Sequence, residues 1–74
     1  MPKLGTFSGR ELCKLLASQG FREVRRPGGS HIIMQRVNGV RTITVPVPDH
    51  KQLKIGTLQS IIRQSELPRD IFLK

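Results

Sequence analysis

Large and reactive side chains are scarce in this sequence. It has no Trp, no Tyr and only three Phe, so few large side chains are available to fill a core. Cys13 is the only cysteine, which excludes an intramolecular disulfide, and the chain lacks the further ligands that a zinc site needs. We therefore expect no metal and no cofactor. Cys13 lies in an apolar periodic segment, which favours a buried thiol over a reactive one.

Long apolar runs and acidic residues are also few. No apolar run approaches the ~20 residues that cross a membrane, and nothing resembles a signal peptide, so we expect a soluble cytoplasmic protein. Lys and Arg number 13 against 5 Asp and Glu, for a net charge of +8 and a pI near 11.3. The basic residues are spread along the chain, which favours a nucleic-acid partner. An acidic protein partner, or charge kept for solubility, remains open. A membrane surface is disfavoured, because no segment joins a basic face to a broad apolar one.

The length of 74 residues predicts a single domain, 1–74, with one thin core. Residues 7–21, "FSGRELCKLLASQGF", predict a complete helix. Ser8 and Glu11 have the spacing of a capping box, and Phe7 and Leu12 occupy the staple positions around it. Gly20 is expected to end the helix in the left-handed conformation.

The middle of the chain predicts three antiparallel strands. Residues 21–26 suit a short edge strand, 27–30 ("PGGS") a turn, and 31–36 ("HIIMQR") a strand. Asn38 and Gly39 predict a type I′ hairpin turn, followed by a returning strand over 41–46.

This turn fixes a predicted register in which Val37 faces Val40, Met34 faces Ile43 and Ile32 faces Val45. Ile32, Met34, Ile43 and Val45 then share the face that meets the helices. The other face, which we expect to be open to solvent, carries His31, Ile33, Gln35, Thr42 and Thr44. His31 is thus predicted to project from the open face at a strand end, and not into the core.

Residues 46–54 are expected to be irregular, because their prolines stop the strand. A second helix is predicted over 55–65, capped by Thr57 or starting a turn earlier, and a short last helix near Pro68. The fold class is therefore α+β, with the order α-β-β-β-α and both helices on one face of a three-stranded antiparallel sheet. This arrangement resembles the double-stranded-RNA-binding domain.

Nearly the whole chain resembles the HicA toxins of HicA–HicB toxin–antitoxin modules. The resemblance lies in "FSGRE", "LASQGF", Gly-Ser-His at 29–31, "TVP" and "LKIGTLQSIIRQ", at these distances from one another. It implies an mRNA interferase, a ribonuclease whose single catalytic histidine corresponds to His31 and whose partner is the HicB antitoxin. Many relatives carry a second histidine where this chain has Ile32, and a glycine where it has Glu66. The first difference leaves His31 in place, and the second concerns a helix end.

Ribonuclease chemistry suits these residues, because RNA carries its own 2′-hydroxyl nucleophile and needs no metal. His31 is predicted to be the general acid or base, since the ordinary pKa of histidine is ~6.5. Gly28, Gly29 and Ser30 would let the RNA backbone approach and bind a phosphate oxygen. Further phosphate contacts are predicted from the cations Arg25, Arg26, Lys51 and Lys54.

Other readings stay open. His50 is a possible acid partner, although a loop role is favoured, and Ser30 is not expected to act as a covalent nucleophile. A non-catalytic RNA-binding module would keep the charge and the sheet without needing His31. A protein-interaction subunit is a second rival. DNA binding has little support, because the sheet separates the helices and leaves no helix-turn-helix.

Overall fold

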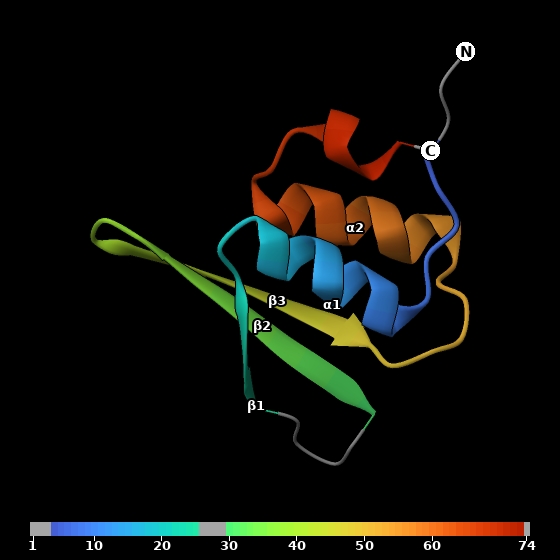
Figure 1. The fold of residues 1–74 in the computed structure, drawn as a ribbon, viewed down its shortest axis with the longest axis horizontal. Helices are drawn as coiled ribbons and strands as arrows, with labels where there is room; N and C mark the ends of the chain where they lie inside the picture. Colours follow the sequence, from blue (N-terminus) through green and yellow to red (C-terminus); the bar gives the residue numbers. More distant parts are fainter. Residues whose placement is uncertain (1–3, 26–29, 74) are drawn as a thin grey trace.

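The computed structural model describes residues 4–25 and 30–73, with Arg25 described by its backbone alone. Helices α1 and α2 lie together on one side of a three-stranded antiparallel sheet of order β1-β2-β3 (Figure 1). The α-β-β-β-α order, the final short helix and the α+β class are as predicted. The elements in chain order are α1 (Gly9–Ser18), β1 (Arg22–Arg25), β2 (His31–Asn38), β3 (Arg41–Pro48), α2 (Ile55–Ser65) and the 3-10 helix η2 (Arg69–Phe72).

Helix α1 has the ends that its sequence predicts. The Ser8 side chain accepts from the Glu11 amide at 3.0 Å, and the Glu11 carboxylate accepts from the Ser8 amide at 2.8 Å, which completes the capping box. At the other end, Gly20 has φ +96, and the Phe21 amide donates to the Leu16 carbonyl at 3.1 Å. These features form a Schellman motif, so local signals alone define this helix.

The register of the β2–β3 hairpin differs from the predicted one by two residues. Asn38 pairs with Arg41, so the two loop residues are Gly39 and Val40 and not Asn38 and Gly39. Gly39 has φ +64 while Val40 does not have positive φ, which is the pattern of a II′ turn. The I′ prediction is therefore wrong. A shift of two keeps every side chain on its predicted face, because side chains alternate with period two.

The new pairs are Met34–Val45 and Ile32–Val47, so Val47 joins the core. Strand β3 accordingly runs on to Pro48, beyond the predicted end at Pro46. The prolines are tolerated because β3 is an edge strand. The Asp49 amide donates to the Ser30 carbonyl at 3.0 Å, so the alternating pattern turns the nitrogens of Pro46 and Pro48 toward the outer edge.

The C-terminal elements close the core. Helix α2 starts at Ile55 with Lys54 as its N-cap, so the earlier of the two predicted starts is correct and Thr57 is not the cap. It ends at Ser65, and its C-cap Glu66 has a left-handed backbone with φ 58. Phe72 of η2 is fully buried and meets Phe7 edge-on at a ring-centroid separation of 6.5 Å.

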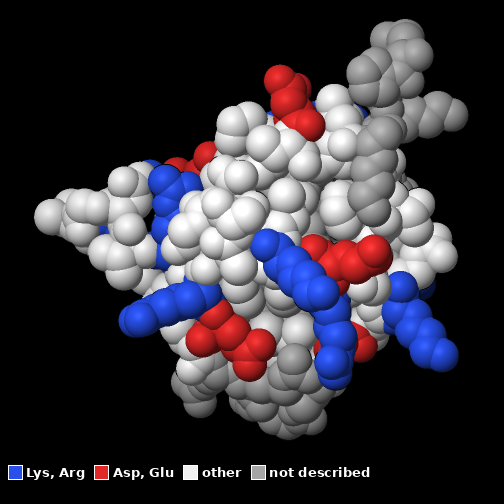
Figure 2. Space-filling model, in the orientation of Figure 1, with Lys and Arg blue, Asp and Glu red and all other residues white. Residues whose placement is uncertain are grey.

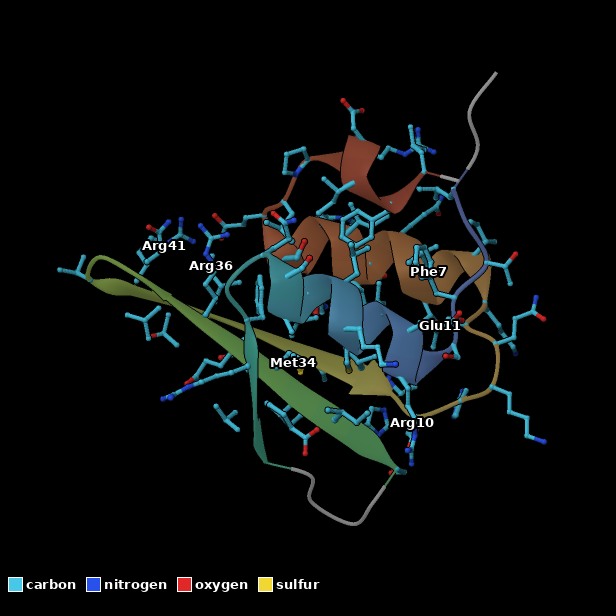
Figure 3. All side chains as sticks on the ribbon, viewed as in Figure 1. Phe7, Arg10, Glu11, Met34, Arg36 and Arg41 are labelled. Atoms are coloured by element: carbon cyan, nitrogen blue, oxygen red, sulfur yellow. The ribbon has the colours of Figure 1, made fainter. Side chains whose placement is uncertain are left out.

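One core lies between the helices and the inner face of the sheet, and Cys13 is half-buried against it. Its buried apolar side chains are Phe7, Leu12, Leu16, Phe21, Ile32, Met34, Ile43, Val45, Val47, Leu53, Leu58, Ile61 and Phe72. Met34 and Phe7 are labelled among the side chains of Figure 3.

Candidate functional site

His31 is the first residue of β2 and is exposed, on the sheet face opposite the helices. Its neighbour Ile32 is buried in the core and Ile33 is half-buried on the open face, so the predicted alternation places His31 outside the core as expected. Ser30 Oγ lies 3.2 Å from His31 Nδ1. In the tautomer in which Nδ1–H donates to Ser30 Oγ, Nε2 is the unprotonated ring nitrogen and can take a substrate proton.

The backbone around His31 is fixed by contacts from three elements. Besides the bond between the Asp49 amide and Ser30, the Gly9 amide donates to the His50 carbonyl at 2.8 Å. A Cβ at Gly9 would lie 2.1 Å from the Pro48 carbonyl oxygen, so α1 packs on the end of β3 as closely as a glycine allows. The start of β2, the end of β3 and the start of α1 thus form one corner of the molecule, which we call the His31 corner.

An ion pair spans this corner on the helix side. Arg10 Nε of α1 lies 3.4 Å from Asp49 Oδ1, directly after β3 (Figure 3 labels Arg10). With the Arg10 side chain 73% exposed, the pair contributes little to stability. The contact places the Asp49 carboxylate beside the first turn of α1.

The predicted RNA-binding residues fall into four groups. Ser30 lies beside His31, as predicted. Lys51 and Lys54 are exposed in the segment between β3 and α2, and neither side chain forms a hydrogen bond or ion pair with the residues that the structure describes. Arg25 is described by its backbone alone, which pairs with Ile33, so its contact with phosphate stays a prediction. Arg26, Gly28 and Gly29 lie outside the described residues.

The side chain of His50 is exposed, while its carbonyl accepts the Gly9 amide described above. His50 therefore has a backbone role in joining α1 to β3. The part of its side chain in catalysis stays a prediction.

Sequence patterns missed a cation on the open face. Arg22 pairs with Gln35, and Arg25 pairs with Ile33, although alternation would place residues three apart on opposite faces. A bulge between Glu23 and Arg25 resets the alternation, so both arginines take open-face positions in the register. The imperfect alternation of "FREVRR" was the only signal of this bulge.

The described surface carries charges of both signs. In the view of Figure 2, Lys and Arg side chains are interspersed with Asp and Glu. Across residues 4–25 and 30–73 no pocket is found, and no three His, Cys, Asp or Glu side chains gather as metal ligands. None of the helices described there is long and apolar enough to cross a membrane. The candidate site is therefore an open surface on which a histidine and a hydroxyl are the reactive groups.

Comparison with known families gives one clear result. The family model described as "HicA toxin of bacterial toxin-antitoxin" matches residues 9–67. Neither the curated proteins nor the solved structures gave a match. Because the family model covers most of the chain, from the start of α1 to just beyond α2, the chain belongs to the HicA toxin family.

Proposed function

Because the chain belongs to the HicA toxin family, we propose that it is an mRNA interferase, a metal-independent endoribonuclease with His31 as general acid or base. The observation that carries the proposal is the position of His31, exposed at a corner fixed by α1, β2 and β3. A histidine retained for packing would face the core, where its neighbours Ile32 and Met34 lie. We place the action of this toxin in the cytoplasm, where messenger RNA is translated.

The chemistry needs no group beyond this chain and its substrate. His31 Nε2 takes the proton of the 2′-hydroxyl, whose oxygen attacks the adjacent phosphorus. The bond to the 5′ oxygen breaks, and that oxygen leaves with a proton from water or a protonated side chain. The products are a 2′,3′-cyclic phosphate and a 5′-hydroxyl. Contact with Ser30 orients the imidazole, and the histidine contributes about 10²–10⁴-fold to the rate.

Charge stabilisation falls to donors and cations around the corner. Ser30, with the amides of Gly28 and Gly29, supplies donors for a phosphate oxygen, while Lys51 and Lys54 supply positive charge. The residues of this set that the structure describes are exposed, which leaves them open to a substrate.

As a member of a toxin family of toxin–antitoxin modules, the chain has an antitoxin partner. We propose that this partner is a HicB-type protein and that it inhibits by covering the His31 corner. Covering is an effective form of inhibition here, because the site is an open surface that a partner can reach directly.

The deciding experiment compares RNA cleavage by the purified chain with cleavage by its His31→Ala and His50→Ala variants, with a chelator present. We expect the parent and His50→Ala to cut, and His31→Ala to bind RNA while cutting at least about a hundredfold more slowly. Equal cutting by the parent and His31→Ala would overturn the assignment. Salt-dependent RNA binding by both, with no cutting by either, would instead establish a non-catalytic RNA-binding module.

A further inference from the structure

The sheet face turned away from the helices has no partner among the described residues, and His31 lies at one end of it. We infer that this open face is the track for the single-stranded RNA next to the cleaved phosphate, with Ile33 and Pro46 as the platform for the first base. The inference rests on the proposed ribonuclease function and names where its substrate lies.

The strand register sets out the track in cross-strand pairs. His31 pairs with Pro48, Ile33 with Pro46, and Gln35 with Thr44. Successive open-face residues along one strand are about 6.6 Å apart, since each residue rises ~3.3 Å. The Ile33–Pro46 pair therefore lies one side-chain step from His31, close enough for a base attached to the reacting ribose or its neighbour.

The chemistry of the pairs changes along the track. Ile33 is half-buried and Pro46 exposed, so the step next to His31 is apolar and offers a flat contact to a base or ribose. The next step is polar, because Gln35 Nε2 donates to Thr44 Oγ1 at 3.2 Å. The carbonyl oxygen and the second N–H of the Gln35 side-chain amide can then form hydrogen bonds with the edge of a base. Phe7, Phe21 and Phe72 are all buried, so none of them offers an aromatic ring on this face. A base would pack on aliphatic side chains, which select only weakly among bases.

Charge favours RNA over a protein as the occupant. Among the described residues the open face carries Arg22 and no carboxylate. All five acidic residues of the chain lie elsewhere: Glu11 in the α1 cap, Glu23 opposite the inward-facing Met34, Asp49 against Arg10, Glu66 against Arg41, and Asp70 in η2. A polyanion can therefore lie along the whole face without meeting a negative side chain.

The test uses two variants with the same change of charge at different places. Thr44→Glu puts a carboxylate on the track, and Gln59→Glu puts one on an exposed position of α2. Each is made in the His31→Ala background, so the probe, a labelled single-stranded RNA of roughly twelve nucleotides, stays intact. We expect Thr44→Glu to weaken binding about three- to tenfold beyond Gln59→Glu, because its charge meets a phosphate at short range.

A gain-of-binding variant keeps the test independent of folding losses. Thr44→Tyr adds a ring beside the platform, and we expect it to tighten binding of single-stranded RNA while leaving duplex RNA unchanged. Equal weakening by Thr44→Glu and Gln59→Glu, together with no gain in Thr44→Tyr, would overturn the track and leave the ribonuclease proposal standing. Loss of antitoxin binding by Thr44→Glu with RNA affinity unchanged would assign the face to the antitoxin. Failure of the parent and the His31→Ala background to bind RNA would overturn both proposals.

Discussion

Gly9→Ala provides a sharp test of how the His31 corner is built. The added Cβ would meet the Pro48 carbonyl oxygen at 2.1 Å and the Asp49 Cα at 3.0 Å. A carbon normally approaches a carbonyl oxygen to about 3.3 Å, so α1 and the end of β3 must separate by roughly 1 Å. Both contacts are to backbone atoms, so no side-chain rotation can relieve them.

Two terms add up in the expected loss of stability. Overpacking of this kind costs about 1–3 kcal/mol, and weakening the Gly9–His50 backbone hydrogen bond adds about 1 kcal/mol. The sum is a large part of the ~4–11 kcal/mol that a domain of this size has in total. With a urea m-value of about 1 kcal/mol per M, the unfolding midpoint should fall by at least about 2 M.

Gly56→Ala is the matched control, because Gly56 also lies in the first turn of a helix but has nothing within 4 Å of its added Cβ. Alanine there should leave the free energy of unfolding unchanged or raise it by up to about 1 kcal/mol through helix propensity, which would raise the urea midpoint by up to about 1 M. A midpoint for Gly9→Ala at or above that of the parent would refute the close packing of α1 on β3.

The same variant tests whether the corner positions the histidine. A shift at Pro48 and Asp49 reaches Ser30 through the Asp49–Ser30 backbone bond, and Ser30 contacts His31. In the absence of urea, and at a temperature at which the variant is folded, its rate of RNA cleavage should fall by about a hundredfold, as a misplacement of ~1 Å can cause. Full activity in the folded variant would separate the corner from catalysis.

Two further predictions concern helix ends and are read by urea unfolding. Ser65 is fully buried, and its hydroxyl donates to a backbone carbonyl and accepts the Leu67 amide at 3.2 Å, so Ser65→Ala should cost about 1–3 kcal/mol. Ser18→Ala, which removes the same kind of bond at an exposed position, should stay within about 0.5 kcal/mol, and equal costs would contradict the burial argument. Glu66→Gly should stabilise by about 0.5–1 kcal/mol, because relief of a left-handed backbone outweighs a partly exposed ion pair with Arg41. Destabilisation instead would show that the ion pair dominates.

Local signals in the sequence were sufficient for α1, whose cap, staple and terminal glycine all lie within a few residues of one another. The hairpin register was harder, because "VNGV" satisfies a turn at Asn38–Gly39 and equally one at Gly39–Val40. The core decides between them, since only the observed register pairs Val47 with Ile32. The turn sequence alone cannot predict that Val47, eight residues after Gly39, is buried.

Some features of the candidate site could likewise be predicted from local sequence, and others could not. The alternation of side chains alone predicted that His31 faces away from the core. This prediction holds although the predicted pairing of β2 with β3 was wrong, because the pairing was shifted by an even number of residues. The open-face position of Arg22 depends on a bulge, and the Arg41–Glu66 pair joins residues 25 apart in the chain. The bulge and the ion pair both depend on how strands pair and helices pack, so no short sequence pattern predicts them.

The two prolines near the end of β3 limit self-association through the exposed edge of the sheet. An exposed strand edge invites another strand to add to the sheet, and a bare edge is a route to aggregation. Pro46 and Pro48 have no N–H to offer along the half of the edge nearest His31, so an incoming strand finds acceptors there and no donors. Strand addition is therefore confined to the half of the edge near Thr42 and Thr44, away from His31.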